Sequence, residues 1–255
     1  MRVMRALVRQ PSPELSRCEL THLPRQFIDA DLATEQHASY VAAFAQLGAA
    51  VEWVPPLPDQ PDGVFVEDTA VVLPEVAVVT RPGAASRRAE VPSVERALGA
   101  YRPLRRIRQP ATLDGGDVLC IGRRILAGLS SRTNEEGIAQ LRQAVRDFGY
   151  DVRAVRVAAC LHLKSACTMI SAGTVIANLA WIDAELLGDV KIINVDTSEA
   201  GAANTLTLGD VTLVSSACPR TEDRLRRAGI RTRAIDVSEL QKAESGLTCM
   251  SLIVS

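Results

Sequence analysis

One cysteine and one histidine in this sequence stand where they could act together on a substrate. Cys249 follows a glycine-containing turn, residues 244–248, and opens the apolar C-terminal segment, which places it at the mouth of a strand. His162 lies between two leucines where another apolar segment begins. A cysteine and a histidine that meet in space can serve as a nucleophile and its acid/base partner. The alternative is that both are ordinary core residues, because the sequence alone does not show that they meet.

Carboxylates are the third component of this chemistry. Glu67 and Asp68 lie inside the apolar run VFVEDTAVV, and Asp114 and Asp117 flank the two glycines of LDGGDVL. Buried carboxylates are costly unless a cation compensates them. A nearby arginine such as Arg87 could be that cation, and the Asp-Gly steps could form turns, but an organic cation as ligand is the functional alternative. Because no histidines and cysteines cluster with these carboxylates, we expect neither a metal site nor a cofactor.

The remaining cysteines and one further histidine are expected to be structural. Since the cysteines have no CxxC spacing, we expect buried free thiols in a reducing cytoplasm rather than disulfides or zinc ligands. His37 lies in an amphipathic helical stretch, where we expect it at the surface or at the edge of the core. The cysteines in this group are Cys18, Cys120, Cys160, Cys167 and Cys218.

The residues that could do chemistry stand at the heads of a recurring sequence unit. Each unit has a short apolar run, a turn, a second apolar run and then a polar, helix-forming stretch. The residues that lead these units are separated by 49, 49, 38 and 45 positions, and a period of about 40–50 residues is typical of repeat architectures. These leading residues are Asp68, Asp117, Ala166, Asn204 and Cys249.

Five such units closing into a ring would bring the leading residues together at one end of the central strands. Closure would also remove the unpaired edge strands of an open sheet. The last segment, LTCMSLIVS, could complete a unit that begins at RALVRQ, while the proline-rich residues 54–63 should form an irregular loop. From the periodicity, a ring and an ordinary α/β sandwich both remain open.

Composition excludes several classes of partner. The chain has 255 residues, a net charge of −1 and no basic run, which argues against nucleic acid and against a polybasic membrane anchor. No segment reaches the roughly 18 apolar residues of a membrane helix, and the first residues lack the apolar core of a signal peptide. We therefore expect one domain, residues 1–255, that acts in the cytoplasm on a small molecule; a homodimer is compatible with the sequence.

Seven motifs, taken in order, resemble the dimethylarginine dimethylaminohydrolases of the guanidino-group-modifying (pentein) superfamily. They are PDGVFVEDTAVV, TRPGAASRRAE, ATLDGGDVL, GLSSRTNEEG, LHLKS, AAN and GLTCMS, and the resemblance extends from about residue 7 to the C-terminus. It implies an α/β fold, a five-bladed α/β propeller of pseudo-five-fold ββαβ repeats. It also implies hydrolysis of dimethylarginine and monomethylarginine to citrulline and a methylamine through a covalent cysteine thiouronium, without cofactor.

The resemblance also implies roles for individual residues. Cys249 matches the nucleophile and His162 the general acid/base, while Asp114 stands where some bacterial members carry glutamate. Glu67 and Asp68 match the carboxylates that hold the guanidinium group.

Other positions match the amino-acid end of the substrate and its surroundings. Leu20 and Asp62 match positions near that end, and Ala243 matches a position that contributes its backbone carbonyl. Arg87 and Arg132 match arginines that bind the substrate carboxylate, although either could instead pair with a glutamate of its own loop.

Related activities form the competing hypotheses. An arginine deiminase usually carries an additional helical domain, and agmatine, the substrate of agmatine deiminases, has no carboxylate for the two arginines to bind. Amidinotransferases are generally larger. A non-catalytic propeller that binds a macromolecule would not need a cysteine, a histidine and buried carboxylates together.

Overall fold

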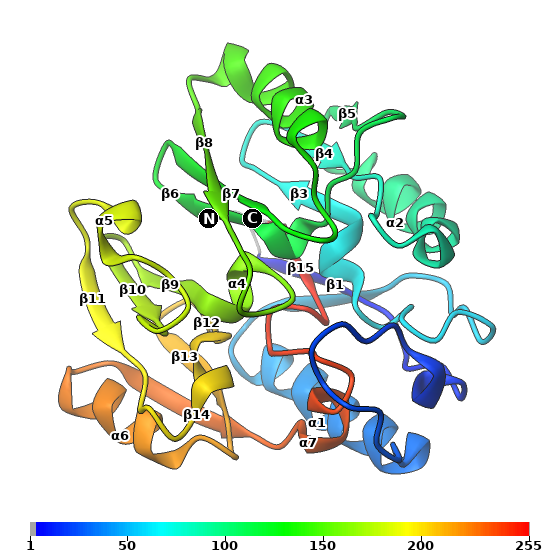
Figure 1. The fold of residues 1–255 in the computed structure, drawn as a ribbon. Helices are drawn as coiled ribbons and strands as arrows, with labels where there is room; N and C mark the ends of the chain where they lie inside the picture. Colours follow the sequence, from blue (N-terminus) through cyan, green and yellow to red (C-terminus); the bar gives the residue numbers. More distant parts are fainter. Residues whose placement is uncertain (1–3, 255) are drawn as a thin grey trace.

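In a computed structural model, residues 4–254 form five three-stranded sheets arranged around a common centre (Figure 1). The first strand of every sheet runs antiparallel to the second, and the second runs parallel to the third. The sheets are β15 (Leu252–Val254), β1 (Arg5–Val8) and β2 (Ala50–Trp53); β3 (Ala70–Val72), β4 (Ala77–Val79) and β5 (Leu104–Arg106); β6 (Val118–Ile121), β7 (Arg124–Leu129) and β8 (Asp151–Arg156); β9 (Cys167–Ser171), β10 (Thr174–Ala177) and β11 (Lys191–Asn194); and β12 (Leu206–Leu208), β13 (Val211–Ser215) and β14 (Arg231–Ile235).

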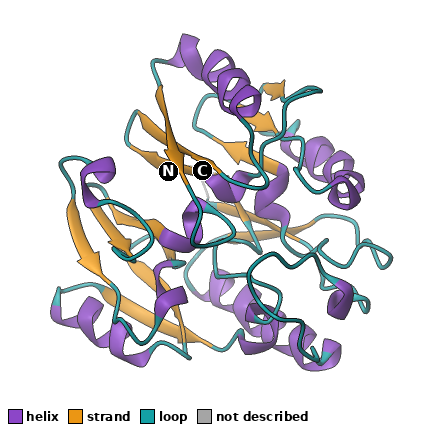
Figure 2. Cartoon of the chain, in the orientation of Figure 1, coloured by secondary structure: helices purple, strands orange, loops and turns teal. Residues whose placement is uncertain are grey.

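A helix connects the second and third strands of each sheet, as a parallel pair requires a crossover. Figure 2 shows these helices on the outside of the molecule and the strands toward its centre. In α3, Ile138, Leu141 and Val145 fall on one buried face, and Asn134 caps the helix by accepting a hydrogen bond from Gly137 N. The crossover helices are α1 (Ala30–Gln46), α2 (Val91–Leu98), α3 (Glu135–Val145), α5 (Ala184–Leu187) and α6 (Pro219–Arg227).

Short helical turns precede four of the five central strands. They carry the predicted leading residues or lie directly beside them, and the fifth strand, β15, begins three residues after Cys249. The turns are η2 (Val66–Thr69), η4 (Gly115–Asp117), α4 (Leu163–Ala166) and η6 (Ala200–Ala203). The remaining short helices are η1 (Leu15–Arg17), η3 (Ala85–Glu90), η5 (Arg146–Phe148) and α7 (Ser238–Gln241).

The five-bladed α/β propeller is confirmed, and the α/β sandwich left open by the periodicity is wrong. The ring closes through β15, which pairs with β1 in the register Arg5↔Val254, so the last strand completes the sheet that the first strand begins. Repeat period and closure therefore bring the ends of the central strands together, which is what positions the site.

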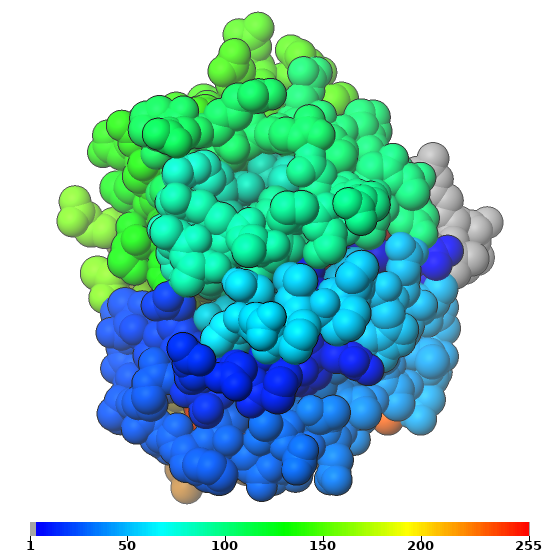
Figure 3. All heavy atoms as spheres, turned by 90° about the vertical axis from the view of Figure 1, so that its right-hand side faces the viewer, coloured from blue at the N-terminus to red at the C-terminus, as the bar shows by residue number. Residues whose placement is uncertain are grey.

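The segment after β1 is held against the irregular loop of residues 54–63. Arg9 is fully buried, and its guanidinium donates to Pro55 O at 3.1 Å, Gly63 O at 2.6 Å and Glu90 O at 3.1 Å. Figure 3 shows this dark-blue segment running across the face between α1 and the cyan part of the chain. This packing brings Glu19 beside Asp62.

His37 does not lie at the surface or the edge of the core, as its sequence context suggests. Its side chain is buried on the inner face of α1, with ring centroids 6.0 Å from Tyr40 and 5.9 Å from Trp53. Burial lowers the pKa of His37 to about 4, which keeps the ring neutral.

Among residues 4–254, no helix is long and apolar enough to cross a membrane.

Candidate active site

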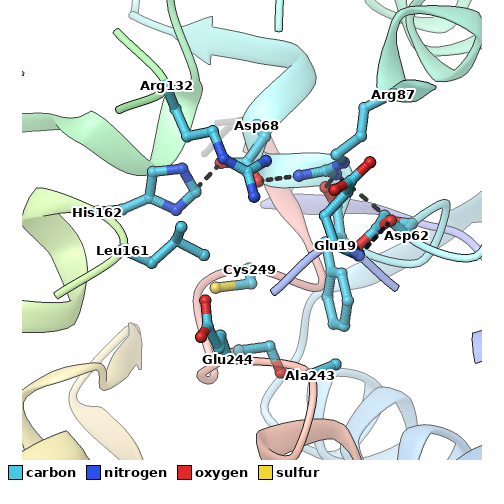
Figure 4. Close-up of a pocket in the computed structure, with 12 residues that line it drawn as sticks. Glu19, Asp62, Asp68, Arg87, Arg132, Leu161, His162, Ala243, Glu244 and Cys249 are labelled. Carbon is cyan, nitrogen blue, oxygen red and sulfur yellow. Dashed lines mark hydrogen bonds and ion pairs between the residues drawn. The ribbon is translucent and has the colours of Figure 1, made fainter. Parts of the chain in front are cut away.

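A pocket opens where the heads of the central strands meet, and it holds about 300 Å³ of empty space (Figure 4). Cys249 lies in the middle of the residues drawn, with His162 on one side and Asp62 on the other. The lining residues are Glu19, Asp62, Phe65, Asp68, Arg87, Arg132, Leu161, His162, Ala243, Glu244, Ser245 and Cys249.

Cys249 sits at the end of a tight turn whose backbone and side chains surround its sulfur. The Sγ atom accepts a hydrogen bond from Gly246 N at 3.3 Å, and Cys249 O accepts one from Glu67 N at 3.0 Å. Burial, followed by the charges of Glu67 and Asp68, raises the pKa of the thiol to about 12. With this pKa, the thiol of Cys249 is neutral at physiological pH.

His162 faces two carboxylates. Its Nε2 lies 3.1 Å from Asp114 Oδ2, and its Nδ1 lies 3.8 Å from Asp68 Oδ1. Burial would lower the pKa of His162, but Asp68, the hydrogen bond to Asp114 and the charge of Asp117 raise it to about 9. The ring is therefore an imidazolium at neutral pH and can donate a proton.

Arg87 is buried in an ion-pair network. Its Nη1 lies 2.5 Å from Asp68 Oδ2, its Nε and Nη2 donate to the carboxylate of Glu90 at 3.1 and 2.9 Å, and Nη2 also donates to Phe65 O at 2.9 Å. Burial would raise the pKa of Asp68, but His162 and Arg87 hold it at about 2. Arg87 thus keeps Asp68 ionised and fixes its orientation, and binding of the substrate carboxylate by Arg87 stays a prediction.

Glu67 lies behind the pocket rather than in its lining. Its carboxylate accepts hydrogen bonds from Lys164 Nζ at 2.7 Å and from Thr248 Oγ1 at 2.6 Å. Because Thr248 directly precedes Cys249, this network ties α4 and η2 to the turn that carries the cysteine. Lys164 had no role in the sequence-based interpretation, although a buried glutamate in an apolar run is itself a signal that a cation must lie nearby.

The other side of the pocket is polar and partly open. Both oxygens of Asp62 accept from Glu19 N, at 3.2 and 3.1 Å. Arg132 is buried, and its Nη2 donates to Thr21 Oγ1 at 3.4 Å. In the part of the chain that the structure describes, Arg132 forms no ion pair with Glu135 or any other carboxylate, so its charge is available to a ligand.

Comparison with known proteins agrees with this geometry. A family model described as arginine deiminase matches residues 100–201. A dimethylarginine dimethylaminohydrolase from Streptomyces coelicolor is 42% identical over 249 residues, which cover 97% of this chain and 96% of that relative. The chain belongs to the dimethylarginine dimethylaminohydrolase family.

Solved structures of the family superpose over the whole chain. One is a cysteine-to-serine mutant from Pseudomonas aeruginosa complexed with citrulline, with a TM-score of 0.94 and 30% identity over 100% of both chains. Another is a histidine-to-glycine variant as an adduct with S-methyl-L-thiocitrulline, with a TM-score of 0.93 and 30% identity, covering 99% of this chain and 100% of that one.

The structure brings together most of the residues that the family resemblance assigns to the site. Glu67 and Asp114 lie just behind the lining. Leu20 is partly buried against the hydrophobic core, while its neighbour Glu19 lines the pocket. The residues that line the pocket as predicted are Asp62, Asp68, Arg87, Arg132, His162, Ala243 and Cys249.

Asp114 and Asp117 have different surroundings, a distinction that the sequence left open. Asp114 contacts His162, whereas Asp117 accepts hydrogen bonds from Ser130 Oγ at 2.6 Å, Thr133 Oγ1 at 2.7 Å and Leu163 N at 3.0 Å. Asp117 therefore braces the loops around the pocket.

Glu244 is a lining residue that the sequence-based interpretation missed. It adopts a left-handed φ of 56°, and its carboxylate accepts hydrogen bonds from the backbone N–H groups of Thr21, His22 and Leu23. This contact joins the turn that carries Cys249 to the loop that carries Glu19 and Leu20. Phe65, Leu161 and Ser245 were missed as well, because their residue types carry no chemical signal.

One group of side chains has the composition of a metal site, which the sequence did not indicate. Ligand atoms of Asp68, Asp114 and His162 lie within 4.8 Å of one another. The positive charges of Arg87 and of protonated His162 already compensate these carboxylates. A protonated imidazole nitrogen has no lone pair to offer a metal, so the group fits an acid/base role better than a metal centre.

Proposed function

We propose that this chain hydrolyses Nω-methylated arginines to citrulline and a methylamine through a covalent intermediate on Cys249. The observation that carries the proposal is one pocket in which Cys249, His162 and the carboxylate of Asp68 meet, within a chain of this family. We also propose that residues 1–255 act as one catalytic domain. The six unpaired cysteines support a reducing, cytoplasmic location.

The carboxylates select a cation and activate the nucleophile at the same time. A guanidinium group bound beside Asp68 and Glu67 would offset the two charges that, after burial, most strongly raise the pKa of the Cys249 thiol. Substrate binding would therefore release the thiol proton and create the thiolate next to the carbon that it attacks. At the other end of the substrate, Arg132 would pair with the α-carboxylate, and Asp62 would lie near the α-amino group.

His162 would move the protons. Attack of the Cys249 thiolate forms the S–C bond and gives a tetrahedral adduct. As the C–N bond breaks, the imidazolium of His162 donates its proton to the departing nitrogen, which leaves as neutral dimethylamine, because the dimethylamide anion is too basic to leave. Neutral His162 then accepts a proton from the water that attacks the thiouronium carbon, which forms the C–O bond and gives a second tetrahedral adduct. Its collapse breaks the C–S bond, the proton of the hydroxyl returns to the Cys249 sulfur as the carbonyl of citrulline forms, and His162 is left as the imidazolium.

A second candidate function is the hydrolysis of unmethylated arginine, which the arginine deiminase match over residues 100–201 favours. Colorimetric detection of citrulline from dimethylarginine, monomethylarginine and arginine, and of the carbamoyl product from agmatine, distinguishes the two. The proposal predicts that the methylated substrates have the highest kcat/KM. A preference for arginine or agmatine would replace it, and inactivity on all four would favour a binding protein.

A further inference from the structure

We propose that Asn204 stabilises the thiolate form of Cys249 and is a further catalytic residue of this site. The inference rests on the proposed function, since it concerns the same nucleophile. Two N–H donors face the sulfur: Gly246 N at 3.3 Å and Asn204 Nδ2 at 3.8 Å. Asn204 heads the fourth repeat unit and comes from 45 residues earlier in the chain, so ring closure rather than local sequence brings it to the sulfur.

The amide of Asn204 can face the sulfur in only one orientation. Its Oδ1 accepts a hydrogen bond from Thr248 N at 2.9 Å, and only the oxygen of an amide side chain can accept. The NH₂ group must therefore point the other way, toward Cys249. The turn also closes tightly on this amide, because a Cβ atom at Gly246 would lie 2.2 Å from Asn204 Cγ.

The backbone around Asn204 is fixed before any substrate binds. Thr168 Oγ1 holds the residues on both sides of Asn204, because it donates to Ala203 O at 2.7 Å and accepts from Thr205 N at 3.2 Å. Asn204 itself is only 8% exposed. A donor held in this way needs no reorganisation when charge develops on the sulfur, which is the property of an electrostatic catalyst.

The Asn204 donor matters because the negative charges of two nearby carboxylates, Glu67 and Asp68, disfavour the thiolate. Glu67 and Asp68 add to the effect of burial and raise the pKa of the thiol, whereas the Gly246 N–H group and the charge of Lys164 lower it. Hydrogen bonds to an ionised acceptor are about twice as strong as those between neutral groups. The Asn204 amide therefore stabilises the thiolate more than the thiol. The competing interpretation is that Asn204 only braces the turn through Thr248.

Two substitutions separate these roles. Asn204→Asp keeps the shape and the oxygen that accepts from Thr248 N, but it replaces the donor with a negative charge. Asn204→Ala removes both functions and provides the measurement if the aspartate variant does not fold. Asn178→Asp is the matched control, because it makes the same chemical change at a buried asparagine that anchors η6 and bonds Ala200 and Ala180.

The readout is the rate at which iodoacetamide alkylates Cys249 in the free enzyme, together with kcat and the melting temperature. Below the thiol pKa, this rate is proportional to the thiolate fraction and falls about tenfold for each unit that the pKa rises. We expect a fall of about tenfold or more for Asn204→Asp, a smaller fall for Asn204→Ala, and a rate within about twofold of wild type for Asn178→Asp. The kcat of both Asn204 variants should fall as well.

Two results would overturn the assignment. One is a wild-type alkylation rate in Asn204→Ala. The other is an equal loss in Asn178→Asp with a lowered melting temperature, which would make Asn204 a brace. Because alkylation needs no substrate, a wild-type chain that forms no citrulline but shows the predicted differences would refute the proposed function and leave the role of Asn204 in place.

Discussion

Replacing Asp114 with asparagine should lower the pKa of His162 and move the alkaline limit of catalysis to lower pH. In the structure, three aspartates overcome the effect of burial and raise this pKa to about 9. The substitution removes the charge of Asp114 but retains a side chain of the same shape at the 3.1 Å contact. An opposite charge within about 4–6 Å shifts a pKa by about 1–3 units, so we expect a fall of at least about one unit, or about 1.4 kcal/mol.

The sign of the effect on catalysis follows from the role of His162 as an acid. The imidazolium exists below its pKa and is lost above it, so kcat should hold up to about pH 9 in the wild type. In Asp114→Asn, kcat should begin to fall at roughly pH 8 or lower, since the pKa moves by at least about one unit.

Nuclear magnetic resonance of protein labelled at histidine measures this pKa directly, because the chain has three histidines. His37, buried in α1 with a pKa lowered by burial to about 4, is the internal control and should not move. An unchanged His162 pKa in a folded Asp114→Asn variant would refute the electrostatic argument. A kcat profile that does not follow the measured pKa would remove His162 from the role of acid.

Four further outcomes are expected. Cys249→Ser should fold normally but lose turnover, because a serine hydroxyl is far less ionised than a thiol; retained citrulline formation would exclude Cys249 as nucleophile. Arg132→Ala should reduce kcat/KM for dimethylarginine by about 30- to 1,000-fold. The kcat/KM for the decarboxylated analogue should fall less, so that the ratio between the two substrates narrows; equal losses on both would contradict carboxylate binding. Arg87→Ala should instead destabilise the fold by about 3–5 kcal/mol in urea denaturation, because the buried carboxylates of Asp68 and Glu90 lose the cation that they share; an unchanged midpoint would contradict that network. Dialysis against a chelator should leave the rate unchanged, and a loss that one added metal restores would show that the carboxylates and imidazole around His162 bind metal.

The part of the site that depends on the repeat was predictable from the sequence. Period and closure place Asp68, His162 and Cys249 at the heads of central strands, and a ring has only one place where those heads meet. Which of the two aspartates in LDGGDVL serves His162 was not predictable. The single turn of η4 sends Asp114 and Asp117 in different directions, and both stand in the same local sequence.

Partners far apart in the chain were also beyond the sequence-based interpretation. Lys164 reaches Glu67 across 97 residues, and Arg87 is held by Asp68 and Glu90 through side-chain geometry that periodicity does not encode. His37 was misplaced for a related reason. The face of an amphipathic helix that becomes buried depends on which neighbours pack against it, and here the neighbours of α1 include β14 and α7.

Mass spectrometry of the enzyme quenched in acid during turnover tests the central claim most directly. With dimethylarginine as substrate, we predict a covalent adduct on the peptide that contains Cys249, with the mass of the substrate less dimethylamine. The adduct should be absent in Cys249→Ser. It should be much reduced when His162 is replaced by glycine, because the departing amine then receives no proton. Turnover with no adduct on Cys249, or an adduct on another residue, would contradict the mechanism.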